Sequence, residues 1–193
     1  MIYNSIVKGR FISRPNRFIA YAEIDGKEEI CHVKNTGRCR ELLIPEADII
    51  LEISDNPNRK TKFDLISVYK NGRLINIDSQ APNKIAAELL PKLFPDYIIK
   101  PEQKYKNSRF DFYLESANKR AFAEVKGVTL ENENIVMFPD APTERGVKHI
   151  NELIQAAENG FDAYILFIIQ MNQVKYLIPN YETHREFLSL IHI

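Results

Sequence analysis

The first part of the chain consists of short runs in which apolar and polar residues alternate. Such runs are typical of β-strands with one buried face, because successive side chains of a strand point to opposite sides. Asp25 and Gly26 separate two of the runs, and this pair is a strong signal for a tight hairpin. The segment RELLI predicts a short helical piece that ends at Pro45. The predicted strands cover residues 5–12, 17–24, 27–33, 47–54 and 62–69.

Five short strands with one short helix predict a small β-barrel of the OB type over residues 1–78. From about residue 79 the apolar residues recur every three or four positions, which is the spacing of an α-helix. Residues 82–94 and 143–160 both predict helices. The second helix is predicted to bury one apolar face, made of Val147, Ile150, Leu153, Ile154 and Ala157.

The last part of the chain predicts further strands after these two helices. The run AYILFII, residues 163–169, predicts a strand buried on both faces and is far too short to cross a bilayer. A second strand is predicted over 174–178, and a helical segment from about 181. The fold class is therefore α/β (α+β), with the OB-like barrel followed, over residues 79–193, by a domain with a central mixed sheet flanked by helices.

Composition adds little to this prediction. The chain has 193 residues, 45% of them hydrophobic and 27% charged, as in an ordinary folded protein. Lys+Arg and Asp+Glu both total 26, so nucleic-acid binding can rest only on local charge. No secretory signal is evident, so reduced thiols and a cytoplasmic protein are expected. Cys31, His32 and Cys39 lack the CxxC pairing and the fourth ligand of a structural zinc site.

Residues 109–127 predict a β-hairpin that carries the carboxylates Asp111 and Glu124 in its strands. If the turn centres between Ala117 and Asn118, Asp111 lies directly opposite Glu124, and Lys126 follows two residues later on the same face. Opposed carboxylates repel each other, and a divalent cation between them removes the repulsion. The alternation places Arg109, Asp111 and Tyr113 on one face and Phe110, Phe112 and Leu114 on the other.

This hairpin supports the hypothesis of metal-assisted phosphodiester hydrolysis. Asp111 and Glu124 would hold Mg²⁺ or Mn²⁺, and Lys126 would offset charge on a phosphate. The alternative is that these charges are simply solvated, with Lys126 paired to either acid.

A local basic excess lies in the predicted barrel. Residues 8–40 carry eight Lys or Arg against four Asp or Glu, a balance of +4. Arginine side chains bind phosphates, and interleaved aromatic rings can stack on bases. For Phe11 and Phe18 the barrel core is the favoured location. The candidate nucleic-acid-binding residues are Arg10, Arg14, Arg17, Arg38 and Arg40.

Four motifs in order resemble the sugar fermentation stimulation protein A (SfsA) family: HVKNTGRCRELLIP, NSRFDFYLE, AEVKGVTL and FPDAPTERGVKHINEL. The resemblance implies an N-terminal OB-like domain, a C-terminal domain of the PD-(D/E)xK nuclease type, DNA binding, and an association with the regulation of sugar catabolism. Asp111, Glu124 and Lys126 take the positions of the motif's acids and lysine. Phe110 stands where that motif has proline.

The resemblance also implies further candidates. The helix before the hairpin often supplies another acid in such folds, and Glu88 is the matching residue, as a third metal ligand. Arg109, Arg145 and His149 are additional candidates for the site. For Glu88, Arg145 and His149 a solvated helix surface is the alternative.

The leading functional hypothesis is a DNA-binding protein with a Mg²⁺-dependent nuclease site; whether it is an enzyme stays open. The alternative is a non-catalytic DNA-binding transcriptional regulator of sugar metabolism, and a third is an adaptor protein whose acidic pair is solvated. Nucleic acid, with DNA favoured over RNA, is the expected partner, with no membrane and no small-molecule cofactor. The apolar C-terminal end, FLSLIHI, can pack internally or form a contact in a homodimer.

Overall fold

The computed structural model describes residues 1–35, 37 and 39–191 and divides the chain into two compact units. Unit 1 contains residues 1–81 and 170–173, and unit 2 contains residues 82–169 and those from 174 onward. Residues 170–173, which the sequence analysis placed in the C-terminal domain, lie in unit 1. Met171 forms an isolated antiparallel bridge with Ile75 there. No helix in the described part of the chain is long and apolar enough to cross a membrane.

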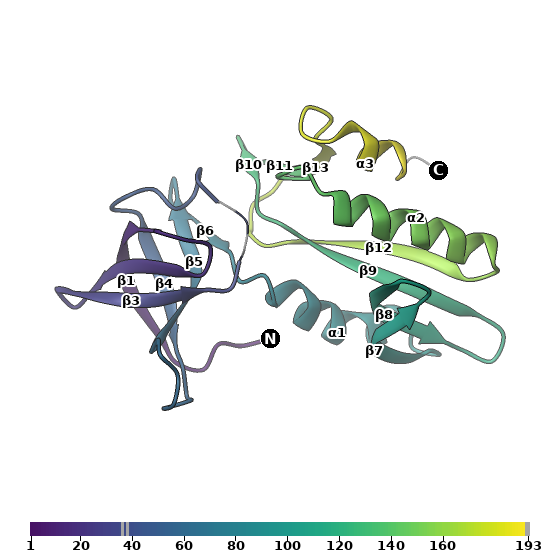
Figure 1. The fold of residues 1–193 in the computed structure, drawn as a ribbon, viewed down its shortest axis with the longest axis horizontal. Helices are drawn as coiled ribbons and strands as arrows, with labels where there is room; N and C mark the ends of the chain where they lie inside the picture. The colour runs from purple at the N-terminus through teal and green to yellow at the C-terminus, as the bar shows by residue number, and fades with distance from the viewer. Residues whose placement is uncertain (36, 38, 192–193) are drawn as a thin grey trace. The chain divides into compact units, whose positions relative to one another are not determined.

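Unit 1 is a closed barrel, as predicted (Figure 1). Its strands follow the order β3-β2-β1-β4-β5-β6, and β3 also pairs with β5, which closes a five-stranded barrel. Asp25 and Gly26 both have positive φ, +50° and +75°, as the tight β2–β3 hairpin requires. The bounds are β1 Ile6–Ser13, β2 Ile19–Ile24, β3 Lys27–Val33, β4 Asp48–Ile53, β5 Phe63–Lys70 and β6 Arg73–Asn76.

The predicted helical piece at residues 40–44 is wrong. The backbone N–H groups of Leu42 and Leu43 both donate to Cys39 O, at 3.1 and 2.8 Å, and the segment forms turns. Five residues cannot propagate a helix, and burial of the leucines in the barrel core decides their conformation instead. Cys31 and Cys39 are both buried in the same core and form no disulfide, and burial raises the pKa of Cys31 to about 12.

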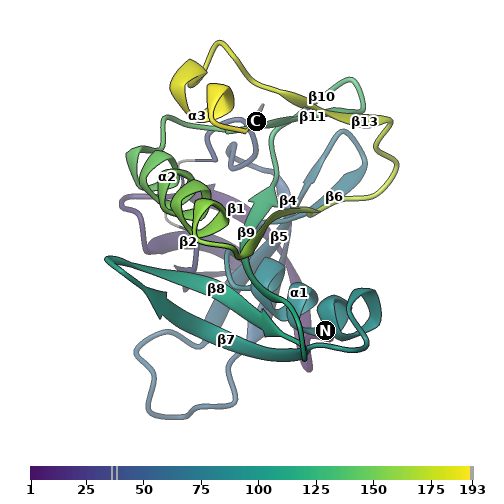
Figure 2. The same ribbon diagram turned by 90° about the vertical axis from the view of Figure 1, so that its right-hand side faces the viewer.

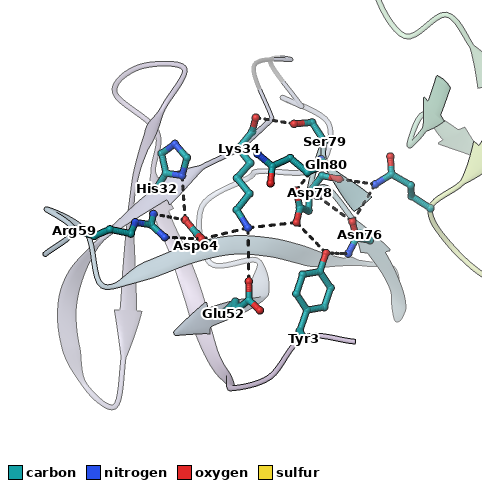
Figure 3. Close-up of polar contacts among 11 residues, drawn as sticks. Tyr3, His32, Lys34, Glu52, Arg59, Asp64, Asn76, Asp78, Ser79 and Gln80 are labelled. Atoms are coloured by element: carbon teal, nitrogen blue, oxygen red, sulfur yellow. Dashed lines mark hydrogen bonds and ion pairs between the residues drawn. The ribbon is translucent and has the colours of Figure 1, made fainter. Parts of the chain in front are cut away.

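A buried polar network lies at one side of the barrel (Figure 3). The Lys34 ammonium lies 3.3 Å from Asp64, 3.5 Å from Asp78 and 3.6 Å from Glu52. Asp78 is fully buried and Asp64 is 3% exposed, so these charges are compensated inside the protein rather than by water. The network holds residues at the end of unit 1 in place, because Asp78 Oδ1 also accepts from the backbone N–H of Gln80.

Unit 2 is built on a four-stranded mixed sheet of order β12-β9-β8-β7, in which β12 and β9 are parallel and the other pairs antiparallel. Helices α1 and α2 cover its opposite faces (Figure 1). This confirms the predicted mixed sheet flanked by helices. The bounds are α1 Ala81–Leu93, β7 Ile98–Tyr105, β8 Ser108–Glu115, β9 Arg120–Val128, α2 Glu144–Glu158 and β12 Asp162–Ile169.

Two features of this sheet differ from the sequence prediction. Strand β12 is only half-buried, because it lies at the sheet edge and not between two strands. Strand β7, the opposite edge, was not predicted. Its sequence, IIKPEQKY, is mostly exposed and polar, which is usual for an edge strand and gives no apolar signal.

A small three-stranded sheet and the short helix α3 complete unit 2 (Figure 2). Phe187 and Leu188 of α3 are buried against Ile150 of α2, so this part of the C-terminal end packs internally. The bounds are β10 Glu131–Asn132, β11 Ile135–Phe138, β13 Tyr176–Pro179 and α3 Arg185–Ser189.

The packing of α3 changes which face of α2 meets the sheet. Val147, Ile150 and Ile154 of α2 lie in one cluster with Phe187 and Leu188 of α3, which also includes Ile165 of β12. The neighbouring face of α2 therefore lies on the sheet, and it includes His149 and Glu152, both buried. The solvated helix surface given above as the alternative for His149 is therefore wrong.

Candidate active site and basic groove

The β8–β9 hairpin has the register that the sequence predicts. Phe112 pairs with Ala123 and Glu115 pairs with Arg120. Continued by one residue beyond the Phe112–Ala123 pair, the same register places Asp111 opposite Glu124. The two acids of the predicted site thus come from adjacent positions on neighbouring strands.

The backbone ladder is interrupted where Asp111 stands. The β7–β8 register passes from Pro101↔Phe112 to Gln103↔Phe110, and Glu102, which it skips, has a positive φ of +57°. The Asp111 carboxylate accepts the backbone N–H of Val125 through Oδ2 at 2.7 Å. The backbone N–H of Val125 in β9 thus donates to a side chain instead of to a neighbouring strand, and this bond holds the Asp111 carboxylate in place.

This interruption also corrects one predicted face. Phe110 was placed with Phe112 and Leu114, but it packs with Phe122 in the cluster beneath α2. Phe112 and Leu114 lie in the other cluster, beneath α1. Strict alternation fails because β8 loses its regular pairing between Phe110 and Phe112.

Helix α1 contributes Asn83 to the site, not Glu88. The Asn83 side-chain amide donates to Asp111 Oδ1 at 2.7 Å. Glu88 is exposed and lies five positions later, about 140° further around the helix. The structure therefore does not bring Glu88 to the other two proposed metal ligands. The sequence does contain a signal for Asn83: it precedes Ala86 and Leu90 by three and seven residues, so all three lie on the face of α1 that is buried against the sheet.

Glu124 lies between two basic side chains. Lys126 Nζ donates to Glu124 Oε1 at 2.7 Å, and His149 Nδ1 contacts the same oxygen at 2.6 Å. Arg145 is exposed, and its Nε approaches His149 Nε2 at 3.5 Å. With His149 donating from Nδ1 and accepting at Nε2, these groups form a chain from Arg145 to Glu124. The structure thus brings together four of the predicted residues, including two from the following helix.

The electrostatics of the acids favour a cation. Burial, and next the charge of Glu124, raise the pKa of Asp111 above its usual value, against the opposing bonds from Val125 N–H and Asn83. Glu124 is 3% exposed, and its second oxygen, Oε2, is buried without a hydrogen-bond partner among the described residues. A buried acceptor of this kind is costly unless another ligand satisfies it.

The donor set is small. Across residues 1–35, 37 and 39–191, no group of three or more His, Cys, Asp or Glu side chains is close enough to hold a metal ion. Two carboxylates fit Mg²⁺ or Mn²⁺ all the same, because Mg²⁺ usually keeps several waters and takes one or two carboxylates. The unpartnered Glu124 Oε2 is the observation on which this fit depends.

Arg109 is engaged elsewhere. Its Nε lies 2.8 Å from Glu102 Oε2, in an ion pair between β8 and β7 with both side chains more than half exposed. It is therefore not among the groups that contact the acids.

Three of the five predicted basic residues of unit 1, Arg14, Arg17 and Arg40, line an open groove of about 470 Å³. Arg17 and Arg40 line it and are exposed. Arg10 lies on β1 in an exposed ion pair with Glu46, at 3.1 Å. Arg38 lies outside the described residues. The lining includes Ser13, Arg14, Asn16, Arg17, Gly37 and Arg40.

Arg14 has a structural role in the groove. Its guanidinium donates to the carbonyls of Arg17 at 2.7 Å, Asn35 at 2.6 Å and Gly37 at 2.7 Å. These bonds tie the β1–β2 loop to the segment after β3. Sequence reasoning assigned Arg14 to nucleic acid and did not anticipate these contacts.

Comparison with known proteins identifies the family. The profile of the SfsA N-terminal OB domain matches residues 12–77, and that of the sugar fermentation stimulation protein RE domain matches residues 80–193. The chain belongs to the sugar fermentation stimulation protein (SfsA) family. Among its SfsA relatives, the homolog from Clostridium beijerinckii is 63% identical over 190 residues, which cover 97% of this chain and 84% of that protein.

Other SfsA proteins resemble the chain over similar lengths. The homolog from Desulfitobacterium hafniense strain Y51 is 60% identical over 189 residues, 97% of this chain and 83% of that protein. A solved structure, Pyrococcus furiosus SfsA in complex with Ca²⁺, is 30% identical with a TM-score of 0.87. The similarity covers 100% of this chain and 84% of that one.

Proposed function

We propose that this SfsA protein binds nucleic acid, with DNA favoured over RNA, and hydrolyses its phosphodiester bonds with the help of Mg²⁺ or Mn²⁺. The observation that carries the proposal is the buried Glu124 Oε2, which has no hydrogen-bond partner among the described residues. Lys126 lies 2.7 Å from Glu124 Oε1, and the charge of Glu124 acts on Asp111. The Ca²⁺ in the Pyrococcus furiosus relative supports a divalent cation here, since Ca²⁺ and Mg²⁺ both prefer oxygen ligands.

Each residue has a defined task in the proposed reaction. Asp111 and Glu124 would hold the cation, which when bound supplies a Lewis acid and activates water. Lys126 supplies a fixed positive charge that offsets the charge developing on a phosphate. Asn83 orients Asp111, and His149 orients Glu124. The basic groove of unit 1 would contact the phosphate backbone.

The test is a cleavage assay on labelled single- and double-stranded DNA and RNA, with Mg²⁺, Mn²⁺ or EDTA. We expect metal-dependent cleavage that is abolished by Asp111→Asn, Glu124→Gln and Lys126→Ala. Glu88→Gln is the matched control, since Glu88 is exposed on another side of α1. Circular dichroism verifies that each variant is folded. Unchanged cleavage in both acid variants would remove this site from the chemistry.

One observation favours the second candidate, a non-catalytic DNA-binding regulator of sugar metabolism. Lys126 and His149 both contact Glu124 Oε1, so the Glu124 charge is partly compensated without any metal. Calorimetric titration with Mg²⁺ and Mn²⁺ separates the two candidates. Metal binding that is lost in Asp111→Asn supports the enzyme, whereas intact DNA binding without metal binding supports the regulator.

A further inference from the structure

The outer surface of strands β2 and β3 carries apolar and aromatic side chains. The register pairs Tyr21 with Ile30 and Ile19 with His32, so these four residues share one face. The intervening Ala20 is fully buried in the barrel core, which makes the shared face the outward one. Ile30 is 48% exposed, and the other three are partly exposed.

Phe18 immediately precedes β2 and is 55% exposed. The sequence analysis favoured the barrel core for this ring, and the structure shows that this is wrong; Phe11 alone of the two phenylalanines lies in the core. Phe18 thus adds an exposed ring to the apolar side chains of the β2–β3 surface, and a group of exposed apolar side chains can mark a binding site.

Phe18 and Tyr21 are each next to a residue that lines the basic groove, through the chain or through strand pairing. Phe18 follows Arg17, which lines the groove. Ser13, another lining residue, is the partner of Tyr21 in the β1–β2 register. The acidic pair of the hairpin, Glu23 opposite Glu28, lies towards the other end of these strands. The rings thus lie at the end of the β2–β3 surface where the positive charge is.

The loop that carries Phe18 is held in place by its own hydrogen bonds. Asn16 Oδ1 accepts from the backbone N–H of Phe18 at 2.9 Å and of Ile19 at 3.0 Å. Arg14 fixes the carbonyl of Arg17 at 2.7 Å. Because the backbone is already ordered, a ligand that uses Phe18 loses little binding free energy to loop ordering.

Exposed rings beside arginines suit a ligand with anionic groups and flat apolar faces. In a duplex, stacked neighbours cover the faces of the bases, whereas a single strand can turn its bases onto aromatic side chains. We propose that unit 1 selects single-stranded nucleic acid, with unpaired bases stacking on Phe18 and Tyr21 and phosphates in the basic groove. This inference rests on the nucleic-acid binding proposed above and adds the substrate class.

The test is fluorescence anisotropy with the full chain in EDTA, so that cleavage does not interfere. The probes are an unstructured pyrimidine oligonucleotide as DNA and as RNA, and a duplex of the same length, each at several salt concentrations. We expect tighter binding of the single strands than of the duplex. Phe18→Ala should weaken single-strand binding on the order of tenfold without changing the salt slope, because the ring contributes stacking and no charge.

Tyr69→Ala is the matched control, since Tyr69 is an exposed aromatic residue of β5, 37% accessible, in the same unit. It should bind like the unsubstituted protein, and Phe18→Trp should retain affinity. Equal affinity for duplex and single strand, or wild-type affinity in Phe18→Ala, overturns the inference and leaves nucleic-acid binding standing. Absence of binding to every probe at low salt overturns both proposals. The DNA and RNA arms show which strand is preferred.

Discussion

Asn83 donates a hydrogen bond of 2.7 Å to Asp111, which links the first turn of α1 to the hairpin of β8 and β9. Glu88 was the third acid expected from α1, but the α1 side chain that contacts Asp111 is the carboxamide of Asn83. It orients Asp111 and favours its ionised form, and it adds no negative charge beside Glu124. In the proposed two-acid site, Asn83 therefore favours the ionised form of Asp111, which is the form that binds a cation.

The first prediction concerns Asn83→Ala. The Asn83 hydrogen bond lowers the pKa of Asp111, which burial and Glu124 raise. Its removal raises that pKa further, so the acidic limb of metal binding should move to higher pH. Calorimetric titration with Mn²⁺ from pH 5 to 8 measures the limb. Glu88→Gln should leave it in place, and an unshifted limb in Asn83→Ala would show that the bond does not control Asp111.

The second prediction concerns His149→Ala. This change leaves Glu124 Oε1 with Lys126 alone, so the carboxylate is less well oriented. Loss of a group that orients a metal ligand typically costs about 10–100-fold in affinity or activity. Metal affinity and cleavage rate should both fall by this factor. Lys148→Ala, at the exposed neighbouring position, is the control, and equal activities in the two variants would contradict an orienting role.

The third prediction concerns Arg17→Ala in the basic groove. Loss of one phosphate contact should weaken binding to all sequences alike and reduce the slope of log K against log salt by about 1. Anisotropy titrations over a salt series measure this slope. Lys27→Ala removes an equal charge at the Asp25–Gly26 end of β3 and should change the slope less. Identical slopes for the two variants would mean that the groove is not the phosphate contact.

The fourth prediction concerns acid stability. Burial raises the pKa of Asp64, but the hydrogen bonds of Arg59, the charge of Lys34 and the contact with His32 outweigh it and lower the pKa to about 2. Because the pKa of Asp64 is lower in the folded than in the unfolded protein, its carboxylate stabilises the fold at pH values above the unfolded pKa, near 3.8. This contribution is lost as the pH falls towards 2. The contribution is on the order of 2 kcal/mol.

Urea unfolding between pH 2 and 6 measures this contribution. In Asp64→Asn the stability should be lower at pH 6 and should change less between pH 4 and pH 2. A pH dependence equal to that of the unsubstituted protein would show that other carboxyls dominate acid unfolding.

The fifth prediction concerns Lys34→Met. Asp78 is fully buried, and the substitution removes the ammonium that lies 3.5 Å from its carboxylate. Removal of one partner from a buried ion pair costs about 3–5 kcal/mol of unfolding free energy. Chemical denaturation measures the loss, with the exposed Lys8→Met as control. Adding Asp78→Asn should recover part of it, and a loss no larger than in Lys8→Met would contradict the network's role.

Much of the site could be predicted from local pattern. Two strands joined by a short turn have few available registers, and alternation of side chains fixes which residues share a face. The opposition of Asp111 and Glu124 follows from these rules, and the pairing of Phe112 with Ala123 agrees with it. The barrel strands followed equally from alternation and from the Asp25–Gly26 turn.

The contributions of the helices could not be predicted in this way. Val147 and Ile150 of α2 pack with Phe187 of α3, while His149 of the same helix contacts Glu124 of the sheet. The pattern of α2 shows an apolar stripe but not its partner. Residues that the helical period places on one face of α2 can therefore face either solvent or the sheet.

The sequence by itself determined the five strands of the closed barrel and the register of the β8–β9 hairpin, because these depend on neighbours along the chain and on period-two geometry. Only the tertiary structure decided that Asn83 and His149, rather than Glu88, complete the site, and that Phe18 is exposed. These outcomes depend on how each helix is rotated about its axis and how each loop is tied down. Contacts between distant segments set both, and no local pattern records them.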